Sequence, residues 1–106
     1  MTDTDKVRAL NDKFRRTFLG GRVVATAGIA NRSDLADIMN RVRCFREFTE
    51  DNDPYGEHDF GTFNHADETF YWKIDYYDGQ LICGSEDPSN PDVTTRVLTI
   101  MLAEEY

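Results

Sequence analysis

TFYWKIDYY, the segment Thr69–Tyr77, alternates apolar and polar side chains in the way that a β-strand with one buried face does. One set of alternate positions is strongly apolar and is predicted to face the core: Phe70, Trp72, Ile74 and Tyr76. The other set is predicted to point to the opposite face of the sheet: Tyr71, Lys73, Asp75 and Tyr77. Asp78-Gly79 follows as a hairpin signal, so Gln80–Cys83 is predicted to return as a neighbouring strand.

Two more strands are predicted earlier in the chain. Phe63 begins one of them after Gly61, and the polar turn Asn64–Glu68 connects it to Thr69–Tyr77. Arg22–Ile29 is an apolar run with β-branched residues at its start, which predicts a buried strand. We expect this strand to join the edge of the meander formed by the other three, so that the sheet has about four strands.

Three helices complete the pattern. Thr4 is the expected N-cap of the first helix, whose apolar stripe consists of Val7, Leu10, Phe14 and Phe18. The opposite face of this helix is expected to be solvated and carries Arg8, Asp12, Arg15 and Arg16. Ser33 is the expected cap of a second helix, whose buried stripe lies within Leu35–Phe48. Proline suits the first position of a helix, so Pro91–Leu102 is predicted to be the third.

The predicted order of elements is α-β-α-β-β-β-α. An antiparallel sheet with helices on one face is the simplest arrangement of this order, and it defines the α+β class. A chain of 106 residues has the length of one domain, so residues 1–106 are expected to form a single α+β domain. Hydrophobic residues make up 40% of the chain, which is enough for one core.

The charge is distributed unevenly along the sequence. The protein contains 12 Lys and Arg and 20 Asp and Glu, a net charge of −8. Residues 1–50 hold ten basic and seven acidic side chains, whereas residues 51–106 hold two and thirteen. This acidity disfavours direct binding to nucleic acid or to an anionic membrane, because their phosphates repel carboxylates. The acidic half of the chain could have a function in binding, or its acids could simply keep a small protein soluble and monomeric.

Two features of the sequence bear on its location. The first residues lack the basic start and apolar run of a secretory signal, and no apolar run approaches the roughly 20 residues that span a bilayer. Cys44 and Cys83 form no Cys-x-x-Cys motif, so we expect both to be reduced, small, buried side chains. These observations together predict a cytoplasmic protein.

The segment Asp51–Gly61 is predicted to be a turn-rich loop with a high density of titratable groups. Four acids, one histidine and two glycines fall within these eleven residues. Its candidate ligands for a divalent metal are Asp51, Asp53, Glu57, His58 and Asp59. Alternatively, these carboxylates accept hydrogen bonds from backbone N–H groups within the turn. His58 with Glu57 or Asp75 is also a candidate acid–base pair for catalysis.

Two further sets of residues are candidates for binding a partner. Tyr71 and Tyr77, which flank Lys73 and Asp75, would form a binding platform with them if no helix covers their side of the sheet. The alternative is that these aromatics form cross-strand pairs that hold the sheet together. The acidic candidates are Asp53, Glu57, Asp59, Glu86 and Asp87. Carboxylates in this number complement a basic protein surface.

Three stretches resemble a known family: Asp51–Gly61, Trp72–Tyr77 and Thr95–Tyr106. The similarity extends from Ala9 to the end of the chain. The family consists of small uncharacterised bacterial proteins and is known mainly as a domain of unknown function. The resemblance implies a bacterial chain of a kind often met on plasmids and other mobile DNA, and it implies no established activity.

These observations lead to a functional prediction and to alternatives. We expect a small, non-enzymatic interaction protein that docks on a basic, nucleic-acid-binding surface of a bacterial protein, such as a mobile-element inhibitor of the anti-CRISPR or anti-restriction type. The alternative is a small metal-dependent or acid–base enzyme that uses the loop 51–59. Direct nucleic-acid binding through the arginines of residues 8–46 is disfavoured by the total charge. No cofactor is expected, and the apolar C-terminal segment leaves a homodimer open.

Overall fold

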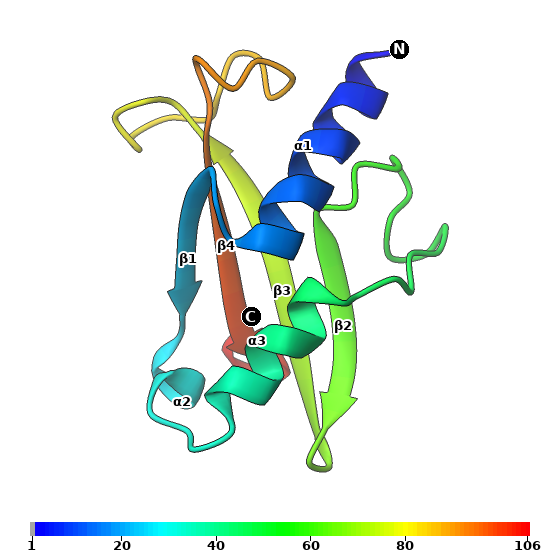
Figure 1. Ribbon diagram of the computed structural model, residues 1–106, viewed down its shortest axis with the longest axis vertical. Coiled ribbons are helices and arrows are strands. Elements are labelled where there is room, and N and C mark those ends of the chain that lie inside the picture. The colour runs from blue at the N-terminus through cyan, green and yellow to red at the C-terminus, as the bar shows by residue number, and fades with distance from the viewer. Residues whose placement is uncertain (1) are drawn as a thin grey trace.

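The computed structural model describes residues 2–106 as a four-stranded sheet with helices packed on one face (Figure 1). The strands are β1 (Gly21–Ala25), β2 (Phe60–His65), β3 (Glu68–Tyr77) and β4 (Thr95–Leu102). The helices are α1 (Asp3–Thr17), α2 (Ala27–Ala30) and α3 (Leu35–Arg43), and the 3-10 turn η1 (Ala103–Glu105) follows β4. The expected α+β class is confirmed, as are the numbers of strands and helices.

β3 confirms the strand predicted at Thr69–Tyr77 and lies at the centre of the fold. Its side chains Phe70 and Trp72 are fully buried, as the alternation predicts. β2 pairs with β3 in the antiparallel direction on one side, and β4 does so on the other. The order across the sheet is β1-β4-β3-β2, so β3 and β4 are the two inner strands.

The segment Pro91–Leu102, predicted to be a helix, forms strand β4 from Thr95 onward, so this prediction is wrong. The side chains of β4 that face the helices are buried: Arg96, Leu98, Ile100 and Leu102. Met101, on the other face, is also buried. Val97 and Met101 place apolar side chains on that second face, so the sequence of β4 lacks a clear period of two and is difficult to distinguish from that of a buried helix.

The sequence also predicts a strand at Gln80–Cys83, but these residues form turns within the loop 78–94. The Asp78 carboxylate accepts hydrogen bonds from the backbone N–H groups of Gln80 and Ile82, both at 3.1 Å. These bonds turn the chain locally. An isolated antiparallel bridge between Tyr77 and Gly84 is the pairing that this segment makes with β3. The position beside β3 is therefore taken by β4.

β1 pairs with β4 in the parallel direction, so the sheet is mixed and not wholly antiparallel as expected. The predicted strand Arg22–Ile29 is shorter than expected, because the chain turns after Ala25 and forms α2. The Glu105 carboxylate stabilises this turn by accepting hydrogen bonds from the Thr26 hydroxyl at 2.7 Å and the Gly28 N–H at 2.9 Å. β1 does lie at the edge of the sheet, as predicted.

α1 and α3 pack on the sheet through buried apolar side chains: Val7, Phe14, Ile38 and Val42. The N-cap of α1 is Thr2, whose hydroxyl accepts a hydrogen bond from a backbone N–H of the first turn, and not Thr4 as expected. α3 ends at Arg43, earlier than predicted. Phe45 and Phe48 still reach the core, but from the segment that follows the helix.

Both cysteines differ from expectation in their exposure. Cys44, directly after α3, and Cys83, in the loop 78–94, are exposed free thiols and are not buried. Among the residues described, no helix is long and apolar enough to cross a membrane.

Candidate functional site

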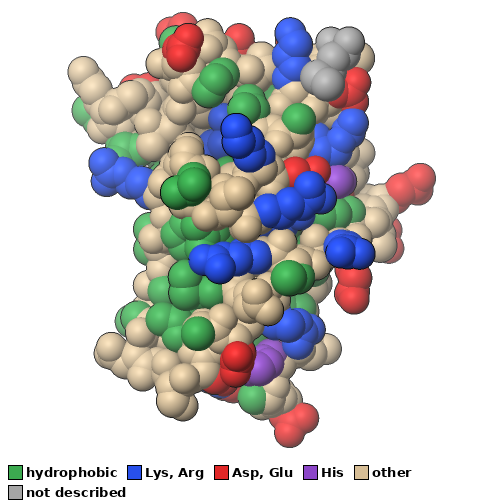
Figure 2. Space-filling view, viewed as in Figure 1, with side chains coloured by type: hydrophobic (Ala, Val, Ile, Leu, Met, Phe, Trp, Pro, Cys, Tyr) green, Lys and Arg blue, Asp and Glu red, His purple; other side chains and the backbone are tan. Residues whose placement is uncertain are grey.

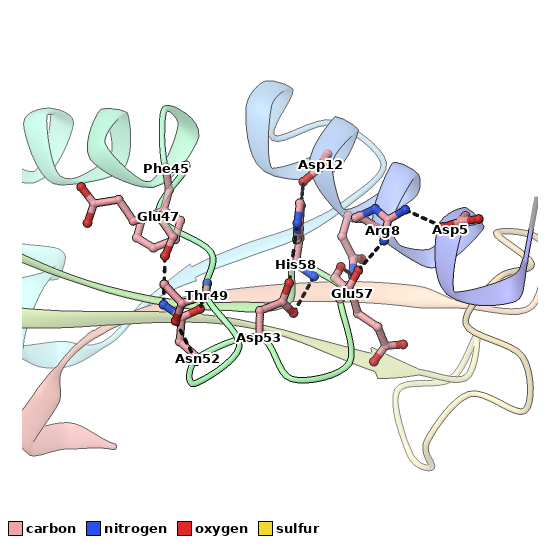
Figure 3. Close-up of polar contacts among 12 residues, drawn as sticks. Asp5, Arg8, Asp12, Phe45, Glu47, Thr49, Asn52, Asp53, Glu57 and His58 are labelled. Atoms are coloured by element: carbon pink, nitrogen blue, oxygen red, sulfur yellow. Dashed lines mark hydrogen bonds and ion pairs between the residues drawn. The ribbon is translucent and has the colours of Figure 1, made fainter.

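The acidic loop, residues 51–59, packs against α1 through His58 (Figure 3). Nδ1 of His58 lies 2.9 Å from Oδ1 of Asp12, and Nε2 lies 3.6 Å from Oδ2 of Asp53. The imidazole also stacks on the ring of Phe48, with centroids 3.7 Å apart and planes 2° apart. His58 is therefore held at Nδ1 by Asp12, on one ring face by Phe48, and at its backbone N–H by Asp53, which accepts at 3.1 Å.

Two arginines of α1 hold the segments that pack beneath the helix. Nη1 of Arg8 donates to the carbonyl of Gly56 at 3.0 Å. Nη1 of Arg15 donates to Asp12 at 2.9 Å, and Nη2 donates to the carbonyl of Phe45 at 3.2 Å. Arg15 is only 1% exposed, so the prediction that it lies on a solvated face is wrong.

Asn11 joins four parts of the fold. Its side chain is fully buried and donates to the carbonyl of Glu57 at 3.0 Å and to the hydroxyl of Tyr76 at 2.8 Å. It also accepts a hydrogen bond of 2.7 Å from Nε of Arg96. Tyr76 in turn donates to Asp59 at 3.1 Å. One amide therefore connects α1, the acidic loop, β3 and β4, which makes the loop part of the folded core.

The pKa values of the carboxyl groups around this network are shifted in opposite directions. Burial raises the pKa of Glu57, and the negative charges of Asp59 and Asp53 raise it further. Burial also raises the pKa of Asp59. Burial of Asp12 acts in the same sense, but hydrogen bonds from its arginine and histidine partners outweigh it and lower the pKa of Asp12. The carboxylates of Glu57 and Asp59 therefore cost stability at neutral pH, whereas that of Asp12 contributes to it.

Replacing Glu57 by glutamine is expected to stabilise the protein at pH 7 by about 0.5 kcal/mol, or roughly 2–4 °C in Tm. The raised pKa of Glu57 in the folded state means that its charge opposes folding above that pKa. Below the unfolded value of 4.5, glutamate is protonated in both states and the gain should vanish. Thermal unfolding at pH 7 and at about pH 4 measures both effects.

Glu50→Gln, an exposed change beside the same loop, is the control and should have no effect at either pH. A destabilised Glu57→Gln variant at pH 7 would contradict this electrostatic account.

The geometry does not favour a metal site or an acid–base pair in the acidic loop. Within residues 2–106, no three His, Cys, Asp or Glu side chains are grouped as metal ligands. His58 pairs with Asp12 and Asp53, whereas Asp75 pairs with Lys73 at 2.7 Å on the opposite face of the sheet. The remaining metal candidates form no such group either: Asp51, Glu57 and Asp59. The loop side chains instead make the contacts expected of a structural turn.

The helices α1 and α3 cover one face of the sheet (Figure 1). The opposite face, here called the open face, carries the predicted platform. A hollow of about 480 Å³ lies on it, lined in part by Lys73, Asp75 and Tyr77. The ring of Tyr71 instead packs against those of Phe60 and Tyr106, each with centroids 5.4 Å away. Three of the four platform residues therefore line the hollow, and the fourth, Tyr71, belongs to an aromatic cluster that includes Phe60 of the neighbouring strand.

The β3–β4 loop, residues 78–94, brings together charge and exposed apolar groups. It contains four acids and no lysine or arginine. The binding candidates Glu86 and Asp87 are both exposed on it. Ile82 is 74% exposed and Val93 is 43% exposed. Exposed apolar side chains among charges of one sign are a feature of surfaces that bind other proteins.

Sequence reasoning missed the residues that hold the acidic loop directly or through a neighbour: Arg8, Asn11, Asp12, Arg15, Tyr76 and Arg96. One signal was available for α1, because Arg8, Asn11 and Arg15 fall at helical spacing and share one face. A polar stripe beside an apolar one can face a buried loop as well as solvent. The backbone carbonyls that accept from Arg8, Asn11 and Arg15 lie 48, 46 and 30 positions away in the sequence, so nothing local identifies them.

The fold and these sites define a small single-domain α+β protein with a mixed sheet, a structurally anchored acidic loop and an exposed acidic β3–β4 loop. The chain matches the family described as "protein of unknown function (DUF3768)" over residues 4–105, and it belongs to that family. A search of curated proteins and a search of solved structures each found no match.

Proposed function

We propose that the protein is a small acidic interaction protein that docks on a basic, nucleic-acid-binding surface of a bacterial protein and catalyses no reaction. The single observation that carries this proposal is the β3–β4 loop. Its four acids have no basic neighbour within the loop, and Ile82 and Val93 project from the same segment. Carboxylates provide complementarity to a basic partner, and buried apolar anchors provide most of the binding free energy in protein interfaces.

The loop has internal hydrogen bonds that favour binding without a large ordering cost. The Asp87 carboxylate accepts from the Ser89 N–H at 3.1 Å, and the Asn90 amide oxygen accepts from the Asp92 N–H at 2.9 Å. The backbone N–H of Ser85 donates to the carbonyl of Tyr76 at 3.0 Å, which ties the loop to β3. A loop that is already ordered loses less conformational entropy when it binds.

The proposal extends to the biological setting. An acidic protein that covers a nucleic-acid-binding surface inhibits whatever enzyme uses that surface. We therefore propose a cytoplasmic inhibitor, carried on bacterial mobile DNA, of the anti-CRISPR or anti-restriction type. Its support is the charge of −11 on residues 51–106 together with the small size of the chain.

Affinity capture from a bacterial lysate tests this proposal, with bound proteins identified by mass spectrometry. The wild type should retain a basic, nucleic-acid-binding protein at about 0.05 M salt and lose most of it at about 0.5 M, because screening weakens charge pairs. The variant Glu86→Lys with Asp92→Lys should lose it at both salts. Asp87 is left unchanged because its carboxylate accepts a hydrogen bond from the Ser89 N–H and so stabilises the turn at residues 87–89.

The matched control is Glu50→Lys with Asp51→Lys, which makes the same change in charge on a distant exposed segment (Figure 1). This control should retain the partner at low salt. If both variants lose the partner protein equally, binding depends only on the net charge of the protein and not on the β3–β4 loop. Retention by the β3–β4 loop variant would place the docking surface elsewhere and contradict the proposal.

A further inference from the structure

The helix-covered face carries a cleft lined by arginines. Two adjoining hollows of about 260 and 410 Å³ share the lining residues Asn40, Cys44, Phe45 and Arg46. Arg41 completes the first hollow, and Arg16 and Arg43 complete the second. We call the combined site the arginine cleft. Figure 2 shows Lys and Arg side chains gathered across this face, with Asp and Glu mostly towards its margins.

The cleft holds positive charge that the protein does not neutralise. Its lining includes four guanidinium groups and a single carboxylate, that of Glu47. Among residues 2–106, the ion pairs of basic side chains involve Arg8, Arg15, Arg32, Lys73 and the two histidines. Carboxylates are not scarce, because the chain has 20 of them against 12 Lys and Arg. Four like charges around one cleft repel each other, and a bound anion would relieve that repulsion.

Helix polarity explains part of this cluster but not all of it. Arg41 and Arg43 lie in the last turn of α3, where cations interact favourably with the helix dipole. Arg16 comes from the last turn of α1, and Arg46 lies beyond the end of α3. The packing of two separate elements therefore brings these four arginines to one cleft.

Two of the arginines are also held in position by aromatic rings. The guanidinium of Arg41 lies 5.1 Å from the ring centroid of Phe63, and that of Arg43 lies 4.3 Å from the centroid of Phe18. Stacking on a ring face leaves the N–H edge of a guanidinium available to an acceptor. That edge matches two oxygens of a phosphate group.

We propose that the arginine cleft binds a small organic phosphate with at least two phosphate groups, of the nucleoside diphosphate class. Four guanidinium groups offer more donors than one carboxylate can accept, whereas a diphosphate has enough oxygens for all of them. The larger hollow falls within the usual range of small-ligand sites, about 300–1,000 Å³. A nucleic-acid strand would extend beyond the cleft and meet a protein with a net charge of −8. A small ligand stays within about one Debye length, roughly 8 Å, of the arginines.

Isothermal titration calorimetry of the full chain tests this site with three probes: pyrophosphate, ADP and a single-stranded oligonucleotide. Pyrophosphate and ADP should each bind with a Kd below about 1 mM at low salt. The variant Arg16→Gln with Arg46→Gln should raise both Kd values at least about tenfold, because two charge-assisted donors are lost. These two side chains are exposed, so the variant is expected to keep the wild-type Tm and circular dichroism spectrum.

The control is Lys13→Gln with Arg22→Gln, which removes the same charge from exposed positions outside the cleft. Its Kd values should stay within about twofold of the wild type. The proposal is overturned if neither phosphate probe binds at about 1 mM, or if the control loses as much affinity as the cleft variant. It is also overturned if the oligonucleotide binds more than about tenfold tighter than ADP. The cleft is independent of the β3–β4 loop, so this result leaves the proposed docking function to its own test.

Discussion

Replacing Asn11 by leucine is expected to destabilise the protein by about 3–5 kcal/mol, which lowers Tm by roughly 15–25 °C in a domain of this size. Leucine has the same number and branching of side-chain heavy atoms as asparagine, so no cavity forms, and the loss comes from the missing hydrogen bonds with a contribution from the larger methyl groups. The change removes the partner of the Glu57 carbonyl, a partner of the Tyr76 hydroxyl and the acceptor of Arg96 Nε. Arg96 is 3% exposed, and a buried charged donor without an acceptor is especially costly.

Thermal unfolding followed by circular dichroism measures this effect. Asn40→Leu is the matched control, because Asn40 is an exposed residue on α3 and its replacement should change stability by no more than about 0.5 kcal/mol. A loss below about 1 kcal/mol for Asn11→Leu would contradict the account in which this amide anchors the acidic loop to the core.

Replacing Arg15 by methionine is the second large effect that we expect, a loss of about 3 kcal/mol at pH 7. Methionine keeps the length of the side chain and its packing near the rings of Phe48 and Trp72, from whose centroids the guanidinium lies 5.2 and 5.4 Å. It leaves the Asp12 carboxylate with His58 as its remaining partner and the Phe45 carbonyl without its arginine donor. Removing one member of a buried ion pair leaves the other as a poorly compensated charge.

The stability lost in the Arg15→Met variant should become smaller as the pH falls. The pKa of Asp12 is lowered in the folded protein, so its stabilising contribution is present above the unfolded value of 3.8 and is lost as the pH falls through the folded value. The gap between wild type and Arg15→Met should therefore shrink at about pH 3. Asp12→Asn combined with Arg15→Met should be more stable than Arg15→Met alone at pH 7, because the orphaned charge is gone.

Arg16→Met is the control for this series, since Arg16 is the adjacent but exposed residue of α1. It should change stability by no more than about 0.5 kcal/mol at either pH. Equal losses for Arg15→Met and Arg16→Met would mean that the burial of Arg15 has no energetic consequence.

The contrast between Arg15 and Arg16 shows where prediction from sequence stops. Both arginines fall on the polar side of the predicted helix, and sequence alone treats them as one solvated face. Arg15 is buried because the carbonyl of Phe45, which comes from a segment 30 residues later, accepts its hydrogen bond. The same limit applies to His58, whose partner Asp12 precedes it by 46 residues. Long-range pairs of this kind leave no local pattern.

The strands show the same distinction between local and non-local information. β3 is predictable because its two faces have different environments and its side chains alternate accordingly. β4 is not, because Val97 and Met101 put apolar side chains on the face opposite the core as well, so its sequence lacks a clear alternation. Val97, Ile100 and Met101 are also spaced at i, i+3 and i+4, as the apolar residues on one face of a helix are. The class and the element counts survive this error, since β4 replaces the strand predicted at Gln80–Cys83 and α2, which was predicted as the end of a strand, replaces the helix predicted at Pro91–Leu102.

The most direct test of the proposed docking surface is site-specific photo-crosslinking in bacterial cells, with a photoreactive amino acid at position 82. Ile82 is 74% exposed on the acidic β3–β4 loop. The matched control places the same group at Tyr55, which is 80% exposed on the acidic loop. We predict a crosslink from position 82 to a basic, nucleic-acid-binding protein and none from position 55. No crosslink from position 82, or the same crosslinked proteins from both positions, would contradict docking through the β3–β4 loop.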